Sequence, residues 1–233
     1  MITTIGFDAD DTLWHNERIF EQAHARYRTL LGRYHDPAAV ERELYATEMQ
    51  NLALYGYGIK GFALSAIETG IRLTDGRIAG DEIRQILELA KQMLAYPVEL
   101  LPGVSGVVAA LAATHALLVI TKGDLRDQER KMADSGLLAH FRAVEVLSEK
   151  DGAAYARILR DHGVAPAEFL MVGNSYKSDI LPVLELGAAA AHVPYELMWE
   201  HERAVRAPAD HPRFVQLRDI TELPAAVARL DSV

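Results

Sequence analysis

The sequence contains no cysteine among its 233 residues. Disulfides, thiolate metal sites and cysteine nucleophiles are therefore excluded, and the composition suits the cytoplasm, where we expect the protein to act. Long hydrophobic runs are also lacking, because the least polar stretch, residues 104–120, is interrupted by Ser105, Gly106, Thr114 and His115. No basic segment followed by an apolar run begins the chain, so we expect neither a membrane span nor a signal peptide.

Positive charge is scarce as well. Lys and Arg together number 24 against 33 Asp and Glu, which gives a formal net charge of −9. Nonspecific nucleic-acid binding depends on clustered Lys and Arg, so we do not expect it here. Small molecules remain as the expected partners, and an acidic chain that handles phosphate needs local cations at its site.

The chain divides into two patterns of secondary structure. Residues 16–96 show helical spacing of apolar residues without a convincing strand, in predicted helices at 16–34, 36–54, 62–73 and 81–94. From Leu101 onward helices alternate with strands. The helices are predicted at 104–113, 128–135, 152–162, 178–186 and 222–230, and the strands at 116–120, 143–147, 169–172, 188–193 and 214–217. Such alternation indicates parallel strands joined by right-handed crossovers. We therefore predict a doubly wound, Rossmann-like α/β core domain from 1–15 and 97–233, with an inserted all-helical cap domain at 16–96.

Carboxylates follow the first predicted strand directly. Ile2, Ile5 and Phe7 indicate a short buried strand, and Asp8 and Asp10 come immediately after it. Unpaired carboxylates are costly to bury, so such a cluster needs a reason. A surface turn is one interpretation, and a metal-assisted phosphoryl-transfer site with Asp8 as nucleophile and Asp10 as acid/base is the other.

Polar loops follow three further strands of the predicted sheet. Parallel strands bring their carboxyl ends to one edge, where open α/β sheets bind ligands. Together the loops supply carboxylates, a hydroxyl, a lysine and an amide, which are the groups that phosphoryl transfer needs. The loops are Thr121-Lys122-Gly123-Asp124, Glu149-Lys150-Asp151 and Gly173-Asn174-Ser175-Tyr176-Lys177-Ser178-Asp179.

These four stretches resemble the four motifs of the haloacid dehalogenase-like hydrolase superfamily, most closely its phosphatases. Phe-Asp-Ala-Asp-Asp-Thr-Leu, residues 7–13, is similar to the first motif, and the others follow in the right order up to residue 193. The family has a helical cap between its first and second motifs, where residues 16–96 lie. One departure concerns the fourth motif, which usually begins Gly-Asp and here reads Gly173-Asn174.

The resemblance implies a role for each site residue. Asp8 is the expected nucleophile and Asp10 the acid/base, while Thr121 and Lys150 hold the phosphoryl oxygens. Lys122 and Trp14 are candidate substrate contacts. The expected cofactor is Mg²⁺, and its ligands would be Asp8, the main-chain carbonyl of Asp10, Asn174 and Asp179; an amide at 174 brings no charge, so Asp179 would carry more of the cation's stabilisation.

Several of these residues also have simpler interpretations. Lys122 and Arg126 suit a solvated loop, Asp124 suits a helix cap, and Ser175 suits either helix entry or order in the metal loop. Trp14 suits hydrophobic packing at the hinge as well as a pocket wall. The Glu200-His201-Glu202 cluster near Trp199 is predicted to be a solvated helix face.

Three functions remain open from the sequence. The leading one is hydrolysis of a small phosphorylated metabolite. The first alternative is a 2-haloacid dehalogenase, against which Asp10 argues, because a halide leaves without a proton. The second is a phosphometabolite-binding module without turnover, for which Asn174 is the only indication. Neither the substrate nor the oligomeric state, monomer or homodimer, follows from the sequence.

Overall fold

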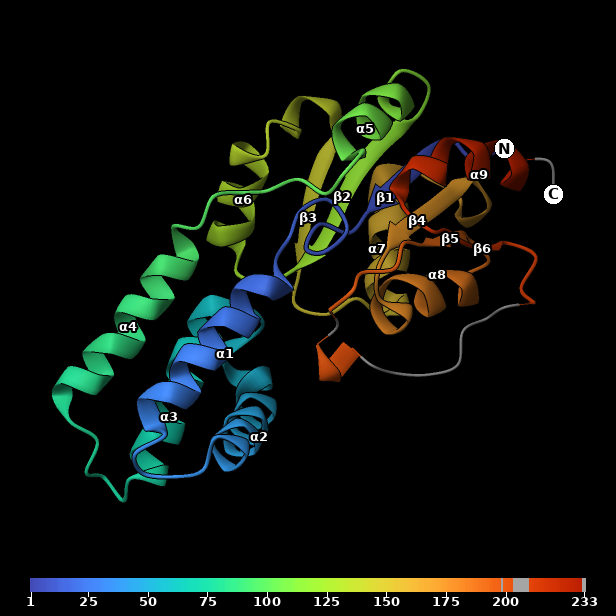
Figure 1. Ribbon diagram of the computed structural model, residues 1–233. Coiled ribbons are helices and arrows are strands. Elements are labelled where there is room, and N and C mark those ends of the chain that lie inside the picture. The colour runs from blue at the N-terminus through green and yellow to red at the C-terminus, as the bar shows by residue number, and fades with distance from the viewer. Residues whose placement is uncertain (198, 203–209, 232–233) are drawn as a thin grey trace. The chain divides into compact units, whose positions relative to one another are not determined.

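The computed structural model describes residues 1–197, 199–202 and 210–231, and the chain in it forms two compact units (Figure 1). One unit comprises residues 1–17, 98–122 and 128–233, and the other comprises 18–97 and 123–127. The second unit includes the five residues 123–127, which lie outside the predicted insertion at 16–96. In the described residues no helix combines the length and apolarity needed to cross a membrane.

A six-stranded, all-parallel sheet forms the centre of the first unit, in the order β3-β2-β1-β4-β5-β6. This arrangement confirms the predicted Rossmann-like α/β fold. The strand β1 is central, and each of its residues is buried because helices cover both faces of a parallel sheet. The strands are β1 (Thr4–Phe7), β2 (Ala116–Lys122), β3 (Ala143–Leu147), β4 (Phe169–Gly173), β5 (Ala189–His192) and β6 (Phe214–Gln216).

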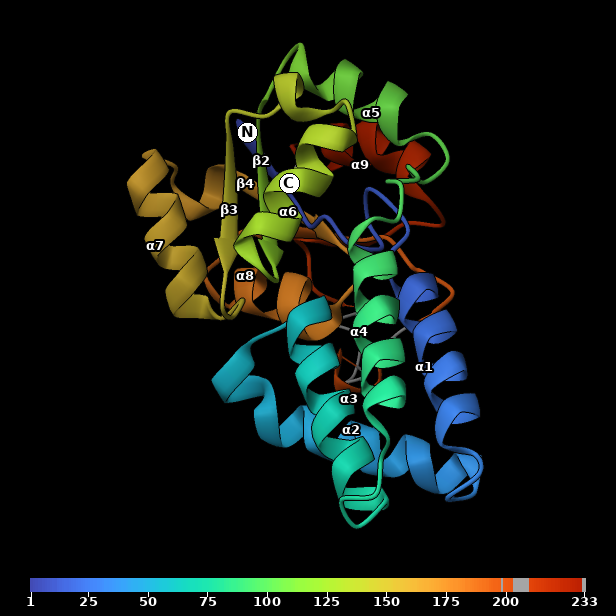
Figure 2. The same cartoon turned by 90° about the vertical axis from the view of Figure 1, so that its left-hand side faces the viewer.

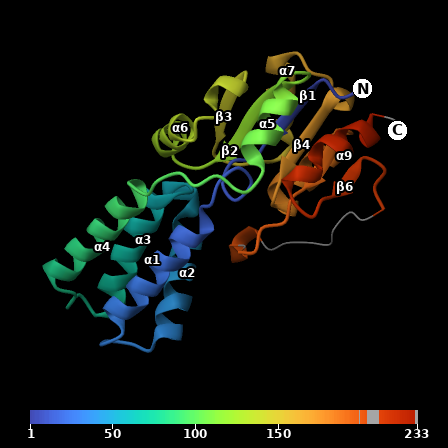
Figure 3. The same ribbon diagram turned by 45° about the horizontal axis from the view of Figure 1, so that its top comes forward.

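Two hydrophobic clusters pack on opposite faces of this sheet. Helices α5 (Val104–Ala112) and α9 (Leu223–Leu230) lie over one face, as Figure 3 shows. The other face carries α7 (Gly152–His162) and α8 (Leu181–Glu185), which Figure 2 shows on the far side of the strands from α5. The helix α6 (Leu125–Asp134) contributes Met132 to the first cluster. Alternate residues of β2 and β4 enter alternate clusters, as the two-residue period of a strand requires.

The second unit contains four helices, as predicted. They are α1 (Glu17–Leu31), α2 (Pro37–Tyr55), α3 (Ile59–Leu73) and α4 (Gly80–Leu94). The carboxylate of Asp36 caps α2 by accepting from the backbone N–H groups of Ala38 and Ala39, at 3.1 and 3.0 Å. Helix α3 begins three residues before the predicted Phe62, because Gly58, with φ of +107°, turns the chain directly into it.

One predicted helix is divided in the structure. The sequence predicts a single helix at 178–186, whereas the chain forms a π turn at Tyr176–Ile180, followed by α8. Pro182 lies in the first turn of α8, where its missing N–H costs no hydrogen bond. The remaining short helices are 3-10 turns at Leu138–His140, Pro166–Glu168, Glu200–Glu202 and Ile220–Glu222.

Candidate active site

The central strand delivers Asp8 to the carboxyl edge of the sheet. Phe7 pairs with Val119 of β2 on one side and with Val172 of β4 on the other. Asp8 follows Phe7, and its backbone N–H donates to the carbonyl of Val172 at 2.8 Å. The loops after β2 and β4 therefore flank Asp8, so the predicted convergence of polar loops at one sheet edge is present in the first unit.

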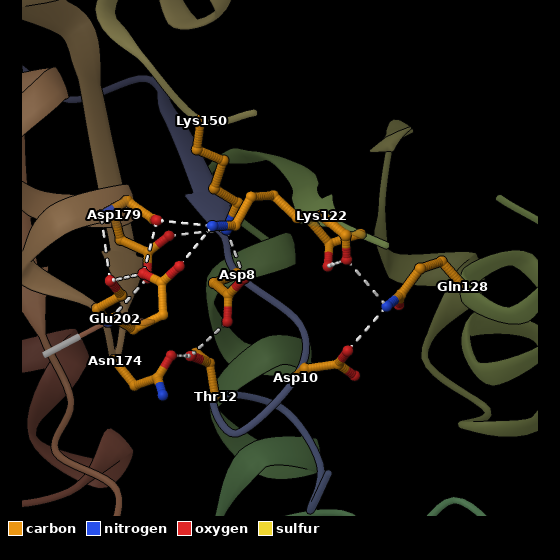
Figure 4. Close-up of polar contacts among 12 residues, drawn as sticks. Asp8, Asp10, Thr12, Lys122, Gln128, Lys150, Asn174, Asp179 and Glu202 are labelled. Carbon is orange, nitrogen blue, oxygen red and sulfur yellow. Dashed lines mark hydrogen bonds and ion pairs between the residues drawn. The ribbon is translucent and has the colours of Figure 1, made fainter. Parts of the chain in front are cut away.

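Lys150 lies between two carboxylates at the centre of this edge (Figure 4). Its Nζ is 2.5 Å from Oδ1 of Asp8 and 2.7 Å from Oδ1 of Asp179. Burial raises the pKa of Asp8 to about 7, and the charge of Lys150 opposes this rise. Burial works against the Lys150 cation, but the charges of Asp179 and Asp8 outweigh it and raise the pKa of Lys150 well above its usual value. Lys150 is therefore a permanent cation beside the proposed nucleophile.

Asp179 is fixed from both of its oxygens. Oδ1 accepts from Lys150, and Oδ2 accepts from the backbone N–H of Ser175 at 3.0 Å. The side chain is 1% exposed. In this conformation Asp179 orients Lys150. Each of its oxygens has a second lone pair, so these two contacts are compatible with the metal role that the resemblance implies for Asp179.

A hydroxyl connects the first and fourth motifs. Oγ1 of Thr12 is 3.0 Å from Oδ2 of Asp8 and 3.5 Å from Oδ1 of Asn174 (Figure 4). The Asp8 and Asn174 oxygens therefore both face the Thr12 hydroxyl. A ring N–H of His192 donates to the carbonyl of Asn174 at 2.9 Å and holds this loop. No local pattern in the sequence predicts that contact.

The oxygens of Asp8 and Asn174 fit a magnesium ion that keeps several waters. Within the part of the chain that the structure describes, no three His, Asp or Glu side chains form a metal-binding group. Mg²⁺ does not need such a group, because it is commonly held by one or two carboxylates together with water and substrate phosphate. The donor set offers one carboxylate and one neutral amide, so it carries less negative charge than two carboxylates would.

Asp10 has a separate set of partners. Lys131 Nζ lies 3.0 and 3.1 Å from its two oxygens, Gln128 donates to Oδ2 at 2.8 Å, and the indole N–H of Trp14 donates to Oδ1 at 2.7 Å. Trp14 is 1% exposed within the hydrophobic core. Its hinge-packing interpretation is therefore the one the structure supports. Gln128 and Lys131 were missed in the sequence because polar residues on a helix usually face solvent.

Lys122 and Glu202 correct the expectation of solvated charges. Lys122 Nζ contacts Oε1 of Glu202 at 2.6 Å, and the two side chains are only 12% and 15% exposed. Glu202 is thus a half-buried ion-pair partner at the sheet edge, not part of a solvated helix face; the side chain of Glu200 lies outside what the structure describes. Thr121 is buried beside Lys122, and its hydroxyl is 3.3 Å from the Lys122 carbonyl.

Three polar residues of the predicted site loops, or beside them in the sequence, cap helices or turns. Asp124 accepts from the N–H of Asp127 at 3.1 Å at the start of α6, as its cap interpretation predicts. Ser175 accepts from the N–H of Ser178 at 3.1 Å at the start of the π turn. Asp11, with φ of +62°, accepts from the N–H of Glu17 at 3.1 Å and leads the chain into α1.

Known proteins resemble this chain in both sequence and fold. A family model described as haloacid dehalogenase-like hydrolase matches residues 2–187. The crystal structure of a haloacid dehalogenase-like family hydrolase from Xanthomonas campestris is 42% identical, with a TM-score of 0.90 over 99% of this chain and 92% of that chain. No curated protein matches.

Two more distant structures share the fold alone. A 2-haloacid dehalogenase from Pseudomonas syringae pv. Tomato is 23% identical, with a TM-score of 0.62 over 98% of this chain and 99% of that one. A predicted phosphoglycolate phosphatase from Haemophilus somnus is 16% identical, with a TM-score of 0.62 over 97% of this chain and 98% of that one. The fold therefore occurs in proteins that are named for either activity. From the family match and the Xanthomonas structure, the chain belongs to the haloacid dehalogenase-like hydrolase family.

Proposed function

We propose that this hydrolase is a magnesium-dependent phosphatase that acts on a small phosphorylated metabolite through an aspartyl-phosphate on Asp8. The observation that carries the proposal is the presence of two carboxylates with separate cations. Asp8 contacts Lys150 at 2.5 Å, and Asp10 contacts Lys131 at 3.0 Å. A second carboxylate beside the nucleophile serves a reaction whose leaving group takes a proton, as an alcohol does.

In the first step an oxygen of Asp8 attacks phosphorus, and the bond between phosphorus and the ester oxygen breaks. Asp10 in its protonated form gives its proton to the departing oxygen. Lys150 and the hydroxyl of Thr121 hold the phosphoryl oxygens, and the Thr12 hydroxyl, 3.0 Å from Oδ2 of Asp8, orients the attacking carboxylate. The products of this step are an alcohol and a phosphorylated Asp8.

In the second step Asp10, now an anion, takes a proton from water. The water oxygen attacks phosphorus, the bond to Asp8 breaks, and inorganic phosphate leaves. The hydrogen bonds from Lys131, Gln128 and Trp14 hold the Asp10 carboxyl in one orientation for both proton transfers. Magnesium held by Asp8, Asn174 and the Asp10 carbonyl would reduce the repulsion between the nucleophile and the anionic phosphate.

The test is hydrolysis of 4-nitrophenyl phosphate with Mg²⁺ by the wild type and by Asp8→Asn. We expect a loss of at least about 10³-fold in kcat, because the variant has a neutral amide in place of the attacking carboxylate. Asp161→Asn is the matched control, since Asp161 is exposed and pairs only loosely with Arg160, at 3.5 Å. Hydroxylamine added during turnover should form a hydroxamate at residue 8, which peptide mass spectrometry detects. Equal rates for the wild type and Asp8→Asn would refute the proposal.

A 2-haloacid dehalogenase is the second candidate, and the low charge of the donor set favours it, because attack on carbon needs neither a metal nor an acid. Release of halide from 2-chloropropionate in the presence of EDTA would select this reaction. A non-catalytic module would bind inorganic phosphate without hydrolysing any ester. The same two assays therefore separate the three functions.

A further inference from the structure

A second polar group, made of one lysine and two serine hydroxyls, adjoins the proposed active site. Lys122 Nζ lies 2.6 Å from Oε1 of Glu202, and the Ser178 hydroxyl donates to Oε2 at 2.7 Å. The Ser175 hydroxyl also donates to Oε2. We call Lys122, Ser175 and Ser178 the anion cradle. Figure 4 shows the Glu202 side chain reaching toward Lys122 on the same side as Asp179.

The cradle presents only donors to its occupant. The Ser178 hydroxyl accepts from Lys122 at 3.0 Å, and the Ser175 hydroxyl accepts from the Ser178 N–H at 3.1 Å. Each hydroxyl has a single hydrogen, which both serines direct to Glu202. Ser175 and Ser178 are 6% and 5% exposed, so these donors are largely shielded from water. Such a site requires an anion, because buried donors and a buried cation are costly without an acceptor.

The cradle residues are covalent neighbours of the proposed site residues. Lys122 follows Thr121, Ser175 follows Asn174, and Ser178 precedes Asp179. The Ser175 backbone N–H donates to Oδ2 of Asp179 at 3.0 Å, and Oδ1 of Asp179 accepts from Lys150 at 2.7 Å, so an anion in the cradle lies within the length of a small molecule from the phosphoryl group. The occupant, Glu202, belongs to the three-residue 3-10 turn Glu200–Glu202. This turn is separate from the loops that carry the other site residues.

We propose that the anion cradle binds a carboxylate of the substrate, and that Glu202 occupies this place when no substrate is bound. The inference rests on the proposed function and adds the substrate class: a small phosphate monoester that also carries a carboxylate a few bonds from the ester oxygen. The side-chain carboxylate of Glu202 is the same functional group as the substrate carboxylate that it would replace. Because Glu202 is tethered, it competes at a high effective concentration, and a substrate without a second anion leaves it in place.

The first arm of the test measures binding without turnover. Acetate is the probe, and its effect on the melting temperature is compared with that of chloride at equal ionic strength in wild type, Glu202→Ala and the double variant Glu202→Ala/Lys122→Met. We expect acetate to stabilise Glu202→Ala, but neither the wild type nor the double variant. If Glu202→Ala does not fold, Glu202→Gln replaces it, since its neutral amide competes less well for a cation. Equal effects of acetate and chloride on the variant would overturn the cradle.

The second arm measures turnover of a matched pair, ethyl phosphate and 2-phosphoglycolate, which differ in the carboxylate. We expect the ratio of kcat/KM, 2-phosphoglycolate over ethyl phosphate, to rise about tenfold in Glu202→Ala and to fall at least tenfold in Lys122→Met, since removing a buried charge partner is strongly felt. Glu185→Gln, an exposed carboxylate in the same unit, is the control for net charge. Unchanged ratios in both variants would overturn the proposal. If 4-nitrophenyl phosphate is hydrolysed but neither of these esters is, the substrate class is overturned and the proposed function stands. If none of the three is hydrolysed, the proposed function fails, and the acetate arm alone decides the cradle.

Discussion

The carboxylate of Asp179 lies against the backbone of Gly173. A Cβ placed on residue 173 would be 2.2 Å from Oδ2 of Asp179 and 2.3 Å from its carboxyl carbon. Such distances are far inside van der Waals contact, so only glycine permits this approach. The glycine of the fourth motif is therefore required by the position of the carboxylate that holds Lys150.

Gly173→Ala is expected to displace Asp179 and, with it, Lys150. Displacements of about 1 Å in a catalytic group cost on the order of 10²-fold in rate, and we expect a loss of that size in kcat/KM. Gly152→Ala is the matched control, because a Cβ at residue 152 would meet no atom within 4 Å. Near-normal activity in a folded Gly173→Ala protein would show that the position of Asp179 does not matter.

Lys131→Met should affect substrates according to their leaving groups. Asp10 would lose the cation that holds it at 3.0 Å, so proton transfer would be less well oriented. For ethyl phosphate, whose leaving oxygen needs a proton, we expect kcat to fall about 10–100-fold. For 4-nitrophenyl phosphate, which leaves as a stable anion, the loss should be much smaller. The exposed Lys91→Met serves as control, and equal losses for both esters would contradict a role of Lys131 in proton transfer.

Asn174→Asp should tighten magnesium binding. A carboxylate in place of the amide adds one negative charge to the donor set, and metal affinity depends on the charge of the ligands. We expect the half-saturating Mg²⁺ concentration to fall about tenfold, with activity abolished by EDTA and restored by Mg²⁺ in both proteins. Gln85→Glu is the control, because it adds the same charge at an exposed position of α4 in the other unit. An unchanged Mg²⁺ requirement would remove Asn174 from the proposed ligands.

Glu202 should make folding stability depend on acid pH. Burial disfavours its ionisation, but the charge of Lys122 and the hydrogen bonds of Ser175 and Ser178 outweigh burial and lower the pKa of Glu202 to about 2. Glutamate in an unfolded chain titrates near pH 4.3, so the unfolded state binds more protons between these values. The stabilisation, on the order of 3 kcal/mol, is nearly complete above about pH 5 and is lost as the pH falls toward 2.

The measurement is the free energy of urea unfolding for the wild type and Glu202→Gln between pH 7 and pH 3. The difference in the free energy of unfolding between the two proteins should be constant above about pH 5 and should become smaller below it. Glu185→Gln, which removes the same charge from an exposed position, is the control for net charge. If the difference in the free energy of unfolding does not change with pH, Glu202 has the same pKa in the folded and the unfolded protein, and the prediction is wrong.

The fold was predictable because its signals are local. The strand Ala143–Leu147 and the helix Gly152–His162 occur with the predicted bounds, since turn residues and glycine mark their ends. The alternation of strands and helices was sufficient for the parallel sheet. The division of the predicted helix at 178–186 was missed, because a π turn leaves no clear pattern in apolar spacing.

The candidate site was only partly predictable. The residues that directly follow strands, such as Asp8 and Asn174, could be assigned to one sheet edge from topology alone. Lys131 and Glu202 could not, because charged residues on a helix or in a loop usually face solvent, and their partners are 121 and 80 residues away in the sequence. Their contacts follow from packing of distant segments, which one sequence does not encode in any local pattern.

The central place of β1 has a consequence for how the enzyme is made. The proposed nucleophile, Asp8, directly follows β1, yet β1 pairs with strands that begin at Ala116 and Phe169, far along the sequence. Pairings over such sequence separations form slowly, because a long loop must close first. A nascent chain that ends before β4 thus carries Asp8 without the neighbours that would make it reactive, and we expect activity to emerge only when β4 has joined the sheet.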